Sequence, residues 1–270
     1  MQLTSQEITA FQKKILEWYE KNQRSLPWRH NRDPYRILIS EVMLQQTQVA
    51  RVIEKYQLWM HSFPTIQELA NASTRDVLSH WSGLGYNRRA LFLHRLAKEL
   101  VETYDGKFPE SEKVLLSLPG IGKYTARALL CFAFDQQIAV VDTNIKKIIL
   151  TQFPQAKDVS EREIEEIAGS LLPEGKAYEW NQALMDYASM ELKNIAHPRV
   201  AKQKPFQQSD RLYRGEILRI LLKNSSLSEN DLYREVCKKK EVERTRFERI
   251  LSGMVREDLL KRQGQMIAII

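Results

Sequence analysis

A turn containing two glycines lies at residues 118–125, which read LPGIGKYT. Two glycines after a proline let the backbone turn tightly, and an apolar helical pattern begins directly afterwards. Backbone N–H groups at the start of a helix bind anions, and the helix dipole favours the same charge. The segment therefore predicts two helices joined by a turn whose Gly120, Gly122 and Lys123 contact a nucleic-acid phosphate. The alternative, an ordinary helix–helix turn, stays open.

The net charge favours the nucleic-acid interpretation. The 270 residues carry 41 Lys and Arg against 34 Asp and Glu, a formal net charge of +7, and such an excess attracts polyanions. Of these residues, 16 basic and 10 acidic ones lie at 201–270, so +6 of the +7 falls in the last quarter of the chain. A basic C-terminal domain is expected.

Cysteine usage and hydropathy limit the class of protein. The chain has two cysteines, Cys131 and Cys237, too few for a disulfide framework or a multi-thiolate metal site. The first 23 residues carry charges throughout, and no later stretch reaches membrane-spanning length. We therefore expect a cytoplasmic protein with no membrane partner and, by default, a monomer.

Helical spacing of apolar residues runs through the first 195 residues, as at Leu93, Leu96 and Leu100, and no alternating strand pattern precedes residue 258. This predicts an all-α domain. Residues 197–210, HPRVAKQKPFQQSD, have two prolines and little periodicity, which is typical of a linker.

The residues after this linker predict a separate small domain. Its expected elements are helices at about 211–223, 228–239 and 243–256, then two short strands around residues 263–264. This order resembles a winged helix, in which the third helix usually enters a DNA groove. The expected DNA contacts on that helix are Arg244, Arg246 and Arg249. The alternative, a solvated face on a small docking module, stays open.

A carboxyl group stands within the mostly apolar run 35–44. Asp33 and Pro34 predict the start of its helix, as N-cap and first residue. Burial of Glu41 in this run would raise the pKa of its carboxyl, which could then stay protonated near neutral pH and act as a general acid. The residue would share a helix face with residues 45 and 48. The residues alone favour the alternative, a Glu paired with an arginine such as Arg29 or Arg36.

A second carboxyl group, Asp142, precedes a helical run, where an N-cap is the commonest role. The positive end of the helix should lower its pKa and keep it ionised. A protonated Glu41 and an ionised Asp142 would make a pair able to break a glycosidic bond. The acid would protonate the leaving base, and the anion would stabilise an oxocarbenium-like sugar.

Six segments together resemble the helix-hairpin-helix DNA glycosylases and, within them, the adenine glycosylases of the MutY type. They are residues 26–29 (LPWR), 40–49 (SEVMLQQTQV), 83–86 (GLGY), 118–125, 142–144 (DTN) and 181–186 (NQALMD). The likeness runs from about residue 10 to 192. It implies an all-α glycosylase domain over residues 1–196 with the active site between two helical subdomains. One subdomain would comprise about residues 30–135, and the other would combine residues 1–29 and 136–196. The winged-helix-like domain would follow at 211–270.

The resemblance also implies roles for individual residues. Glu41 would protonate adenine, Asp142 would stabilise or capture the sugar cation, and Tyr124 and Asn144 would assist around the sugar. The pocket for the extruded base would be lined by Leu26, Trp28, Arg29 and Leu44. The space left in the duplex would be filled by Gln46 and Tyr86. The implied substrate is double-stranded DNA in which adenine is mispaired with 8-oxoguanine or guanine, and the implied process is base excision repair.

Bifunctional relatives carry a Schiff-base lysine at the position of Tyr124, so the resemblance implies base removal without efficient strand cleavage. The adjacent Lys123 should face away. The family usually binds an iron-sulfur cluster with four cysteines after its Met-Asp/Glu segment, and residues 189–193, SMELK, continue here without cysteine. We therefore expect no cluster and a metal-free segment after residue 192. Proteins of the MutY type commonly end in a larger Nudix-like domain that recognises 8-oxoguanine, and we expect none here because 270 residues are too few for it. Recognition of 8-oxoguanine is therefore the weakest part of the resemblance.

Two other functions compete with adenine excision. A mismatch thymine or uracil glycosylase would share the turn, the aspartate and Tyr124, but Glu41 and the pair Gln45-Gln46 argue against it. A DNA-binding protein without turnover would keep the turn and the basic C-terminal domain. The presence of both Glu41 and Asp142 argues against that function.

Overall fold

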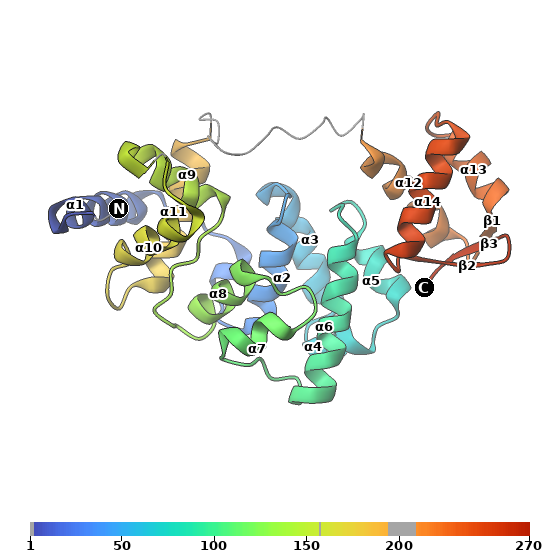
Figure 1. Cartoon of the computed structure of the whole chain (residues 1–270). Helices are drawn as coiled ribbons and strands as arrows, with labels where there is room; N and C mark the ends of the chain where they lie inside the picture. Colours follow the sequence, from blue (N-terminus) through green and yellow to red (C-terminus); the bar gives the residue numbers. More distant parts are fainter. Residues whose placement is uncertain (1–2, 157, 194–208) are drawn as a thin grey trace. The chain divides into compact units, whose positions relative to one another are not determined.

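Helices make up most of the chain, as the spacing of apolar residues predicts (Figure 1). The computed structural model describes residues 3–156, 158–193 and 209–270. In the described part of the first 195 residues there is no β-strand, which confirms the all-α prediction. No helix in the described ranges is both long and apolar enough to cross a membrane.

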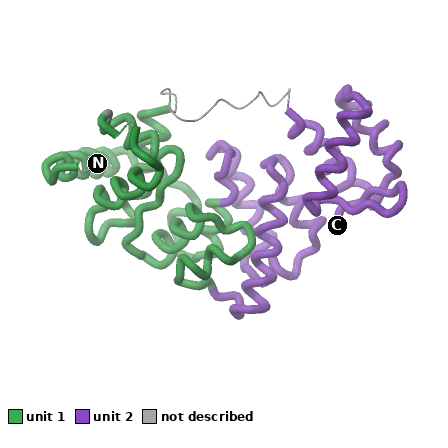
Figure 2. Tube along the Cα trace, viewed as in Figure 1, with its two compact units in different colours: residues 1–41, 108–201 green, residues 42–107, 202–270 purple. Residues whose placement is uncertain are grey.

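The chain folds as two units, and each combines two separate stretches of sequence (Figure 2). Unit 1 comprises Met1–Glu41 and Phe108–Ala201, and unit 2 comprises Val42–Lys107 and Lys202–Ile270. The boundaries of these units differ from those of the two helical subdomains that the resemblance implies. The subdomain boundaries stay a prediction. The linker predicted at 197–210 lies, up to residue 208, outside the described residues.

Unit 1 is entirely helical in its described residues. Its elements are α1 (Ser5–Asn22), η1 (Pro27–Arg29), α2 (Pro34–Leu44, of which the part after Glu41 belongs to unit 2), α7 (Glu112–Ser117), α8 (Lys123–Phe132), α9 (Thr143–Gln152), η2 (Pro154–Ala156), α10 (Glu161–Ser170) and α11 (Ala177–Glu191). Helix α1 starts with a capping box in which Thr4 and Glu7 each accept from the other's backbone N–H. Phe11 of α1 packs edge-to-face on Phe153 and Trp180, with ring centroids 5.3 and 5.8 Å away. This aromatic cluster joins α1, α9 and α11 into one core.

Helices from both halves of the sequence form unit 2. Its first stretch contains α3 (Val49–Ser62), α4 (Ile66–Asn71), α5 (Thr74–Trp81) and α6 (Arg88–Tyr104). Trp59 and Trp81 are fully buried and meet edge-to-face at 5.5 Å, so α3 and α5 share a core.

The second stretch of unit 2 has the predicted elements in the predicted order. They are α12 (Asp210–Lys223), β1 (Leu227–Ser228), α13 (Glu229–Cys237), α14 (Arg244–Arg256), β2 (Leu260–Gln263) and β3 (Met266–Ile269). The strands form an antiparallel sheet of order β1-β3-β2, with Lys261 opposite Ala268. The sequence analysis missed β1, because a two-residue strand shows no alternation. The three helices and the two longer strands are confirmed.

Arginines of the first stretch of unit 2 hold the second stretch. Arg75 of α5 donates from Nη1 to the carbonyls of Leu221 and Leu222, at 2.9 and 3.0 Å, and from Nη2 to those of Asn224 and Ser225. The last carbonyls of a helix have no partner within it, so this guanidinium closes the end of α12. A second contact between the two stretches is the exposed ion pair of Arg95 Nη2 with Asp258 Oδ2, at 2.9 Å.

We predict that Arg75→Ala weakens the docking of α12. Hydrogen bonds from a charged donor contribute about 1.5–3 kcal/mol, so the free energy of unfolding in urea should fall by about that amount. The control is Arg234→Ala, because the Arg234 side chain is 74% exposed and pairs with Asp231 within its own helix. Exposed pairs contribute at most about 1 kcal/mol. Equal unfolding curves for the two variants would contradict the docking role of Arg75.

Candidate active site

The carboxyl group of Glu41 is buried in unit 1. Helix α2 begins at Pro34, and Asp33 Oδ1 accepts from Tyr35 N at 2.8 Å, which confirms the predicted helix start. Glu41 is only 6% exposed. Its hydrogen-bond partner is Tyr124 of α8, whose hydroxyl donates to Glu41 Oε2 at 2.6 Å. The Glu–Arg pair that the residues alone favoured is therefore replaced by a Glu–Tyr pair.

The surroundings of Glu41 favour its protonated form. Burial raises the pKa of the carboxyl to about 7, and the nearby Asp142 carboxylate acts in the same direction. The Tyr124 hydrogen bond and the Arg29 charge oppose this rise. Near neutral pH the carboxyl is thus present in both forms, which is the state a general acid needs.

Asp142 caps helix α9, as predicted. Its Oδ1 accepts from Ile145 N at 2.7 Å, and its Oδ2 accepts from the Asn144 amide at 2.9 Å. The predicted lowering of its pKa is wrong, because burial raises the pKa above its usual value although both hydrogen bonds lower it. The contacts expected from the helix end are present, but loss of water outweighs them.

Asn181 of α11 fixes the segment that leads to Asp142. Its Oδ1 accepts from Val140 N at 2.8 Å, and its Nδ2 donates to the carbonyls of Ile138 and Ala177 at 3.0 and 2.8 Å. The Asn181 side chain is fully buried. These bonds set the backbone two residues before the cap, so α11 positions the second carboxyl.

Arg29 is held by a carboxylate that the sequence analysis did not single out. Its Nη1 and Nη2 donate to the two oxygens of Asp186, each at 2.7 Å, and Arg24 Nε donates to Asp186 Oδ1 at 2.7 Å. Burial raises the Asp186 pKa, but the hydrogen bonds from Arg29 and Arg24 bring it below its usual value. The Arg29 side chain is 8% exposed, and its buried Nε–H has no hydrogen-bond partner among the described residues. Leu26 and Trp28, the neighbouring predicted pocket residues, are both buried.

The two-glycine turn joins helices α7 and α8, as predicted. Gly120 has a left-handed backbone, with φ +75°, and helix α8 begins directly after Gly122. Gly122 provides no side-chain cap, and a Cβ there would meet nothing within 4 Å. The turn therefore leaves open space beside Gly122, at the start of α8. The Lys123 ammonium lies 2.5 Å from Glu165 Oε2, on α10, and lowers the pKa of that carboxyl.

The other predicted pocket residues, Leu44, Gln46 and Tyr86, belong to unit 2. Helix α2 ends at Leu44 and Gln46 takes a left-handed backbone, with φ +57°. The predicted helix face shared with residues 45 and 48 is therefore wrong. Tyr86 is 37% exposed and also left-handed, with φ +48°.

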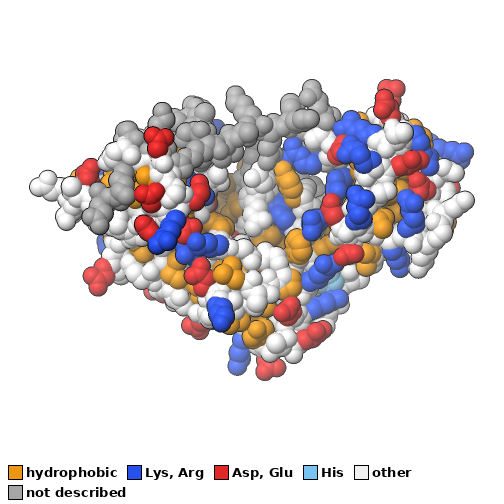
Figure 3. Space-filling model, viewed as in Figure 1, with side chains coloured by type: hydrophobic (Ala, Val, Ile, Leu, Met, Phe, Trp, Pro, Cys, Tyr) orange, Lys and Arg blue, Asp and Glu red, His pale blue; other side chains and the backbone are white. Residues whose placement is uncertain are grey.

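The three arginines predicted to contact DNA from α14 all form ion pairs within unit 2. Arg244 pairs with Glu229 and Glu248, whereas Arg246 and Arg249 share Asp210 at 2.8 Å. In the view of Figure 3, acidic side chains lie among the Lys and Arg side chains over α12–α14. A DNA phosphate would have to displace a carboxylate at each of these arginines. Their contact with DNA stays a prediction.

The thiols present do not fit a four-cysteine cluster. The sequence holds two cysteines, and Cys131 is buried in unit 1, where Asn181 donates to its sulfur at 3.3 Å. Burial raises the pKa of this thiol to about 12, which opposes the thiolate form that metals bind. Among the described residues, no group of three His, Cys, Asp or Glu side chains is arranged to hold a metal.

Comparison with known proteins identifies similar chains. A model of the HhH-GPD superfamily, described as base excision DNA repair proteins, matches residues 39–174. The adenine DNA glycosylase of Rattus norvegicus is 39% identical over 194 residues, covering 67% of this chain and 37% of that protein. The adenine DNA glycosylase of Mycobacterium tuberculosis (strain CDC 1551 / Oshkosh) is 45% identical over 136 residues, covering 50% and 45%. The chain thus spans less than half the length of either relative.

A solved structure of a thermostable thymine-DNA glycosylase is also similar. It aligns with a TM-score of 0.65 and 30% identity, over 76% of this chain and 92% of that one. The similarity of the chain therefore extends to glycosylases named for two different bases.

We predict that the buried Glu41 carboxyl lowers stability at alkaline pH. The folded pKa of about 7 lies above the ordinary value of 4.5, so the folded state binds more protons between these values and loses stability as pH rises through them. Glu41→Gln removes this loss. The variant should match the wild type below pH 4.5 and exceed it by up to about 3 kcal/mol above pH 7.

Urea unfolding at pH 5 and pH 8 measures this difference. Glu174→Gln, at an exposed position, is the control and should show no pH-dependent gain. A Glu41→Gln variant that gains nothing at pH 8 would show that the carboxyl is not desolvated.

Proposed function

Because the chain belongs to the HhH-GPD superfamily of base excision DNA repair proteins, we propose that it is a monofunctional DNA glycosylase of the MutY type. It excises adenine that is mispaired with 8-oxoguanine or guanine in double-stranded DNA. The observation that carries this proposal is the buried Glu41 carboxyl, hydrogen-bonded to Tyr124 at 2.6 Å and near the Asp142 carboxyl. The named adenine glycosylases support the choice of base.

Glu41 supplies a proton to the leaving base. Adenine is a poor leaving group as an anion, and protonation of a ring nitrogen lets it depart neutral. A carboxyl with a pKa of about 7 can give up a proton at neutral pH with little free-energy cost. The Tyr124 hydroxyl, which donates to Oε2, orients the carboxyl and stabilises the carboxylate that remains.

Asp142 stabilises the sugar as the bond breaks. The N-glycosidic electron pair leaves with the base, and positive charge develops on the sugar ring. The Asp142 carboxylate, oriented by Ile145 N and the Asn144 amide, would neutralise part of this charge. Water then adds to the sugar carbon, and its proton returns to the Glu41 carboxylate. The base and an abasic sugar are the products.

The pocket and the turn provide binding. Arg29, fixed by Asp186 in a two-pronged pair, keeps one buried Nε–H for an acceptor on the extruded base, beside Leu26 and Trp28. The first turn of α8, after Gly120 and Gly122, binds a backbone phosphate regardless of sequence.

We further propose that the end of helix α11 is held without an iron-sulfur cluster. Lys147 is buried, and its ammonium donates to the Leu192 carbonyl at 2.5 Å. Trp18 Nε1 donates to Glu191 at 3.1 Å. These contacts fasten the C-terminal end of α11. The metal-free segment expected beyond residue 192 falls, from residue 194 on, outside the described residues.

Thymine excision from a mismatch is the second candidate, because the thymine-DNA glycosylase aligns over 92% of its length at 30% identity. Thymine can leave as an anion and needs an acid less than adenine does. A protonated Glu41 would then have no part in the chemistry, which is why adenine is preferred.

The decisive experiment offers four duplexes, with A opposite 8-oxoguanine, A opposite G, T opposite G and U opposite G. We expect alkali-dependent cleavage only at adenine, at a rate that falls as pH rises through about 7, where Glu41 loses its proton. Glu41→Gln and Asp142→Asn should each reduce the rate at least about 100-fold. Cleavage at T or U that survives Glu41→Gln would establish the second candidate. If no base is released from any of the four duplexes, the protein would be a DNA-binding protein without glycosylase activity.

Tyr124→Lys tests the monofunctional reaction. A lysine at this position would place an amine near the sugar carbon, so covalent capture and strand cleavage without alkali should rise. The control is Tyr124→Phe, which removes the hydroxyl without adding a nucleophile and should not nick DNA. If the lysine variant excises adenine but gains no nicking, position 124 does not face the sugar.

A further inference from the structure

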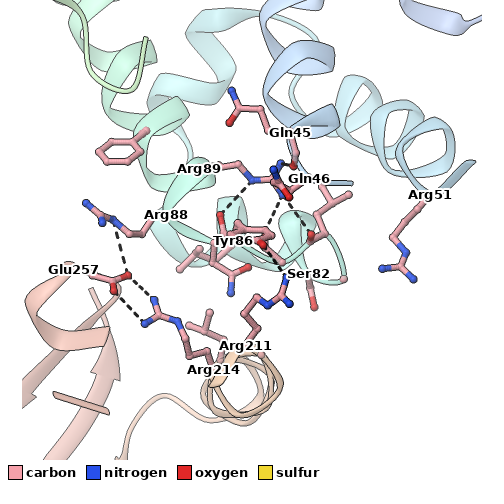
Figure 4. Close-up of a pocket in the computed structure, with 18 of the residues that line it drawn as sticks. Gln45, Gln46, Arg51, Ser82, Tyr86, Arg88, Arg89, Arg211, Arg214 and Glu257 are labelled. Carbon is pink, nitrogen blue, oxygen red and sulfur yellow. Dashed lines mark hydrogen bonds and ion pairs between the residues drawn. The ribbon is translucent and has the colours of Figure 1, made fainter. Parts of the chain in front are cut away.

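Unit 2 contains a cavity of about 700 Å³ that both of its stretches of sequence line (Figure 4). One side is formed by residues 45–46, the first turn of α3 and the loop 82–87, and the other by helix α12. The charged residues in the described lining are Arg51, Arg88, Arg89, Arg211, Arg214 and Glu257. Five guanidiniums against one carboxylate make the cavity positive, which favours an anionic ligand nearby.

Two of these arginines connect parts of the unit. Arg89 is 9% exposed, and its guanidinium donates to the carbonyls of Gln45 and Gly85, at 2.5 and 3.0 Å. Burial lowers the Arg89 pKa to about 10, so the side chain stays charged at neutral pH. Arg211 of α12 donates to the Tyr86 hydroxyl at 2.7 Å. Both guanidiniums are therefore bound within the fold.

Two further arginines share a carboxylate. Arg214 forms a two-pronged pair with Glu257, at 3.1 and 2.5 Å, and Arg88 lies 3.9 Å from the same group. Figure 4 shows these ion pairs as dashed lines. A ligand phosphate at either arginine would have to compete with Glu257.

Arg51 lines the cavity in a different way. It is exposed, in the first turn of α3, and forms no ion pair or side-chain hydrogen bond with any residue that the structure describes. Figure 4 shows its side chain extending from the helix, with no dashed line to the other residues drawn. Glu54, three residues further on, is exposed as well and does not pair with it. The positive charge of Arg51 is thus not neutralised within the described part of the chain.

Lys55 provides a second such cation on the same face of α3, four residues after Arg51. Its side chain lies along the loop 82–87, because a Cβ on Gly83 would meet Lys55 Cε at 3.5 Å and Nζ at 3.9 Å. The lysine is half-buried, and its ammonium has no ion-pair partner in the described ranges. Like charges four residues apart on a helix repel each other. Without a bound anion, this pair therefore lowers the stability of α3.

We propose that Arg51 and Lys55 together bind one backbone phosphate of the DNA, beside the loop 82–87. This inference rests on the proposed function for its ligand, double-stranded DNA. Residues four apart on a helix have neighbouring Cβ atoms, so both long side chains can reach the oxygens of one phosphate. The phosphate would accept charge-assisted hydrogen bonds from the guanidinium and the ammonium, and it would remove their mutual repulsion.

This pair is better suited to a phosphate than the arginines of α14. Arg244, Arg246 and Arg249 each have a carboxylate partner, as listed by residue above. Exchanging a carboxylate for a phosphate gains no charge pair, whereas a phosphate at two unneutralised cations gains one. The contact carries no sequence information, because every nucleotide has the same phosphate.

The test measures binding without excision. The duplex carries a tetrahydrofuran abasic analogue opposite guanine, and fluorescence anisotropy gives Kd between 50 and 200 mM NaCl. The double variant Arg51→Gln/Lys55→Gln should lose about one phosphate contact from the salt slope, so its affinity falls about 3-fold less over this range than that of the wild type. The exchanged variant Arg51→Lys/Lys55→Arg keeps both charges and should keep the slope. An unchanged slope in the double Gln variant overturns the proposal.

Lys98→Gln is the matched control, because it removes an exposed cation of α6, in the same unit but outside the cavity lining. It should bind as the wild type does. If it reduces the slope as much as the double Gln variant, the effect comes from net charge and the proposal fails. A loss of about two phosphate contacts in the double Gln variant would mean two separate phosphates, which also contradicts a shared site.

Thermal melting separates binding from a structural role. The double Gln variant should melt at the wild-type temperature or above it, because it removes the repulsion between the two cations. A lower melting temperature together with the reduced slope would mean that these side chains hold the fold, and the proposal fails.

An inorganic-phosphate arm distinguishes the source of the anion. Millimolar phosphate should leave the melting temperature of the wild type unchanged. If it stabilises the wild type but not the double Gln variant, while both give one salt slope on the duplex, the ligand is a free anion and the proposal fails. Because this duplex has no base to excise, a protein that excises no adenine can still pass, and an active glycosylase can still fail.

Discussion

The buried carboxyl of Glu41 is the constraint around which unit 1 is arranged. Placing this group among apolar residues costs free energy whenever it is charged, and the fold meets that cost with one neutral hydroxyl rather than a cation. The nearby arginine is already bound by Asp186. A direct Arg29–Glu41 pair would have kept the carboxyl ionised and removed its proton. The pairing of Arg29 elsewhere is thus as important as the Tyr124 contact.

The pKa of the second carboxyl, Asp142, is set by the same loss of water on burial. Asp142 has every local feature that should keep it acidic, namely a helix start, a backbone N–H and an amide donor. Burial still raises its pKa. Burial therefore raises the pKa of both carboxyls. Their hydrogen-bond donors, however, differ. Glu41 has one hydroxyl donor, whereas Asp142 has a helix end. Under the proposed function, this difference would let Glu41 act as the acid while Asp142 serves as the anion.

Local patterns predicted much of the fold, because they depend on neighbours in the chain. Asp33 and Pro34 start α2, Asp142 caps α9, and the helices after residue 210 lie where spacing placed them. Contacts between distant residues were not predictable. Tyr124 is 83 residues from Glu41, and Arg211 is 125 residues from Tyr86. The face expected beyond Leu44 failed because a buried Arg89 captures carbonyls where the helix would have continued.

The thiol of Cys131 has a consequence for damage to the protein itself. Its pKa of about 12 leaves almost no thiolate at neutral pH, and peroxides attack the thiolate. The side chain is also fully buried, and Asn181 donates to its sulfur. Oxidants that modify nucleobases would therefore find no reactive sulfur at this position. Cys131 thus fills core space as a small apolar side chain would.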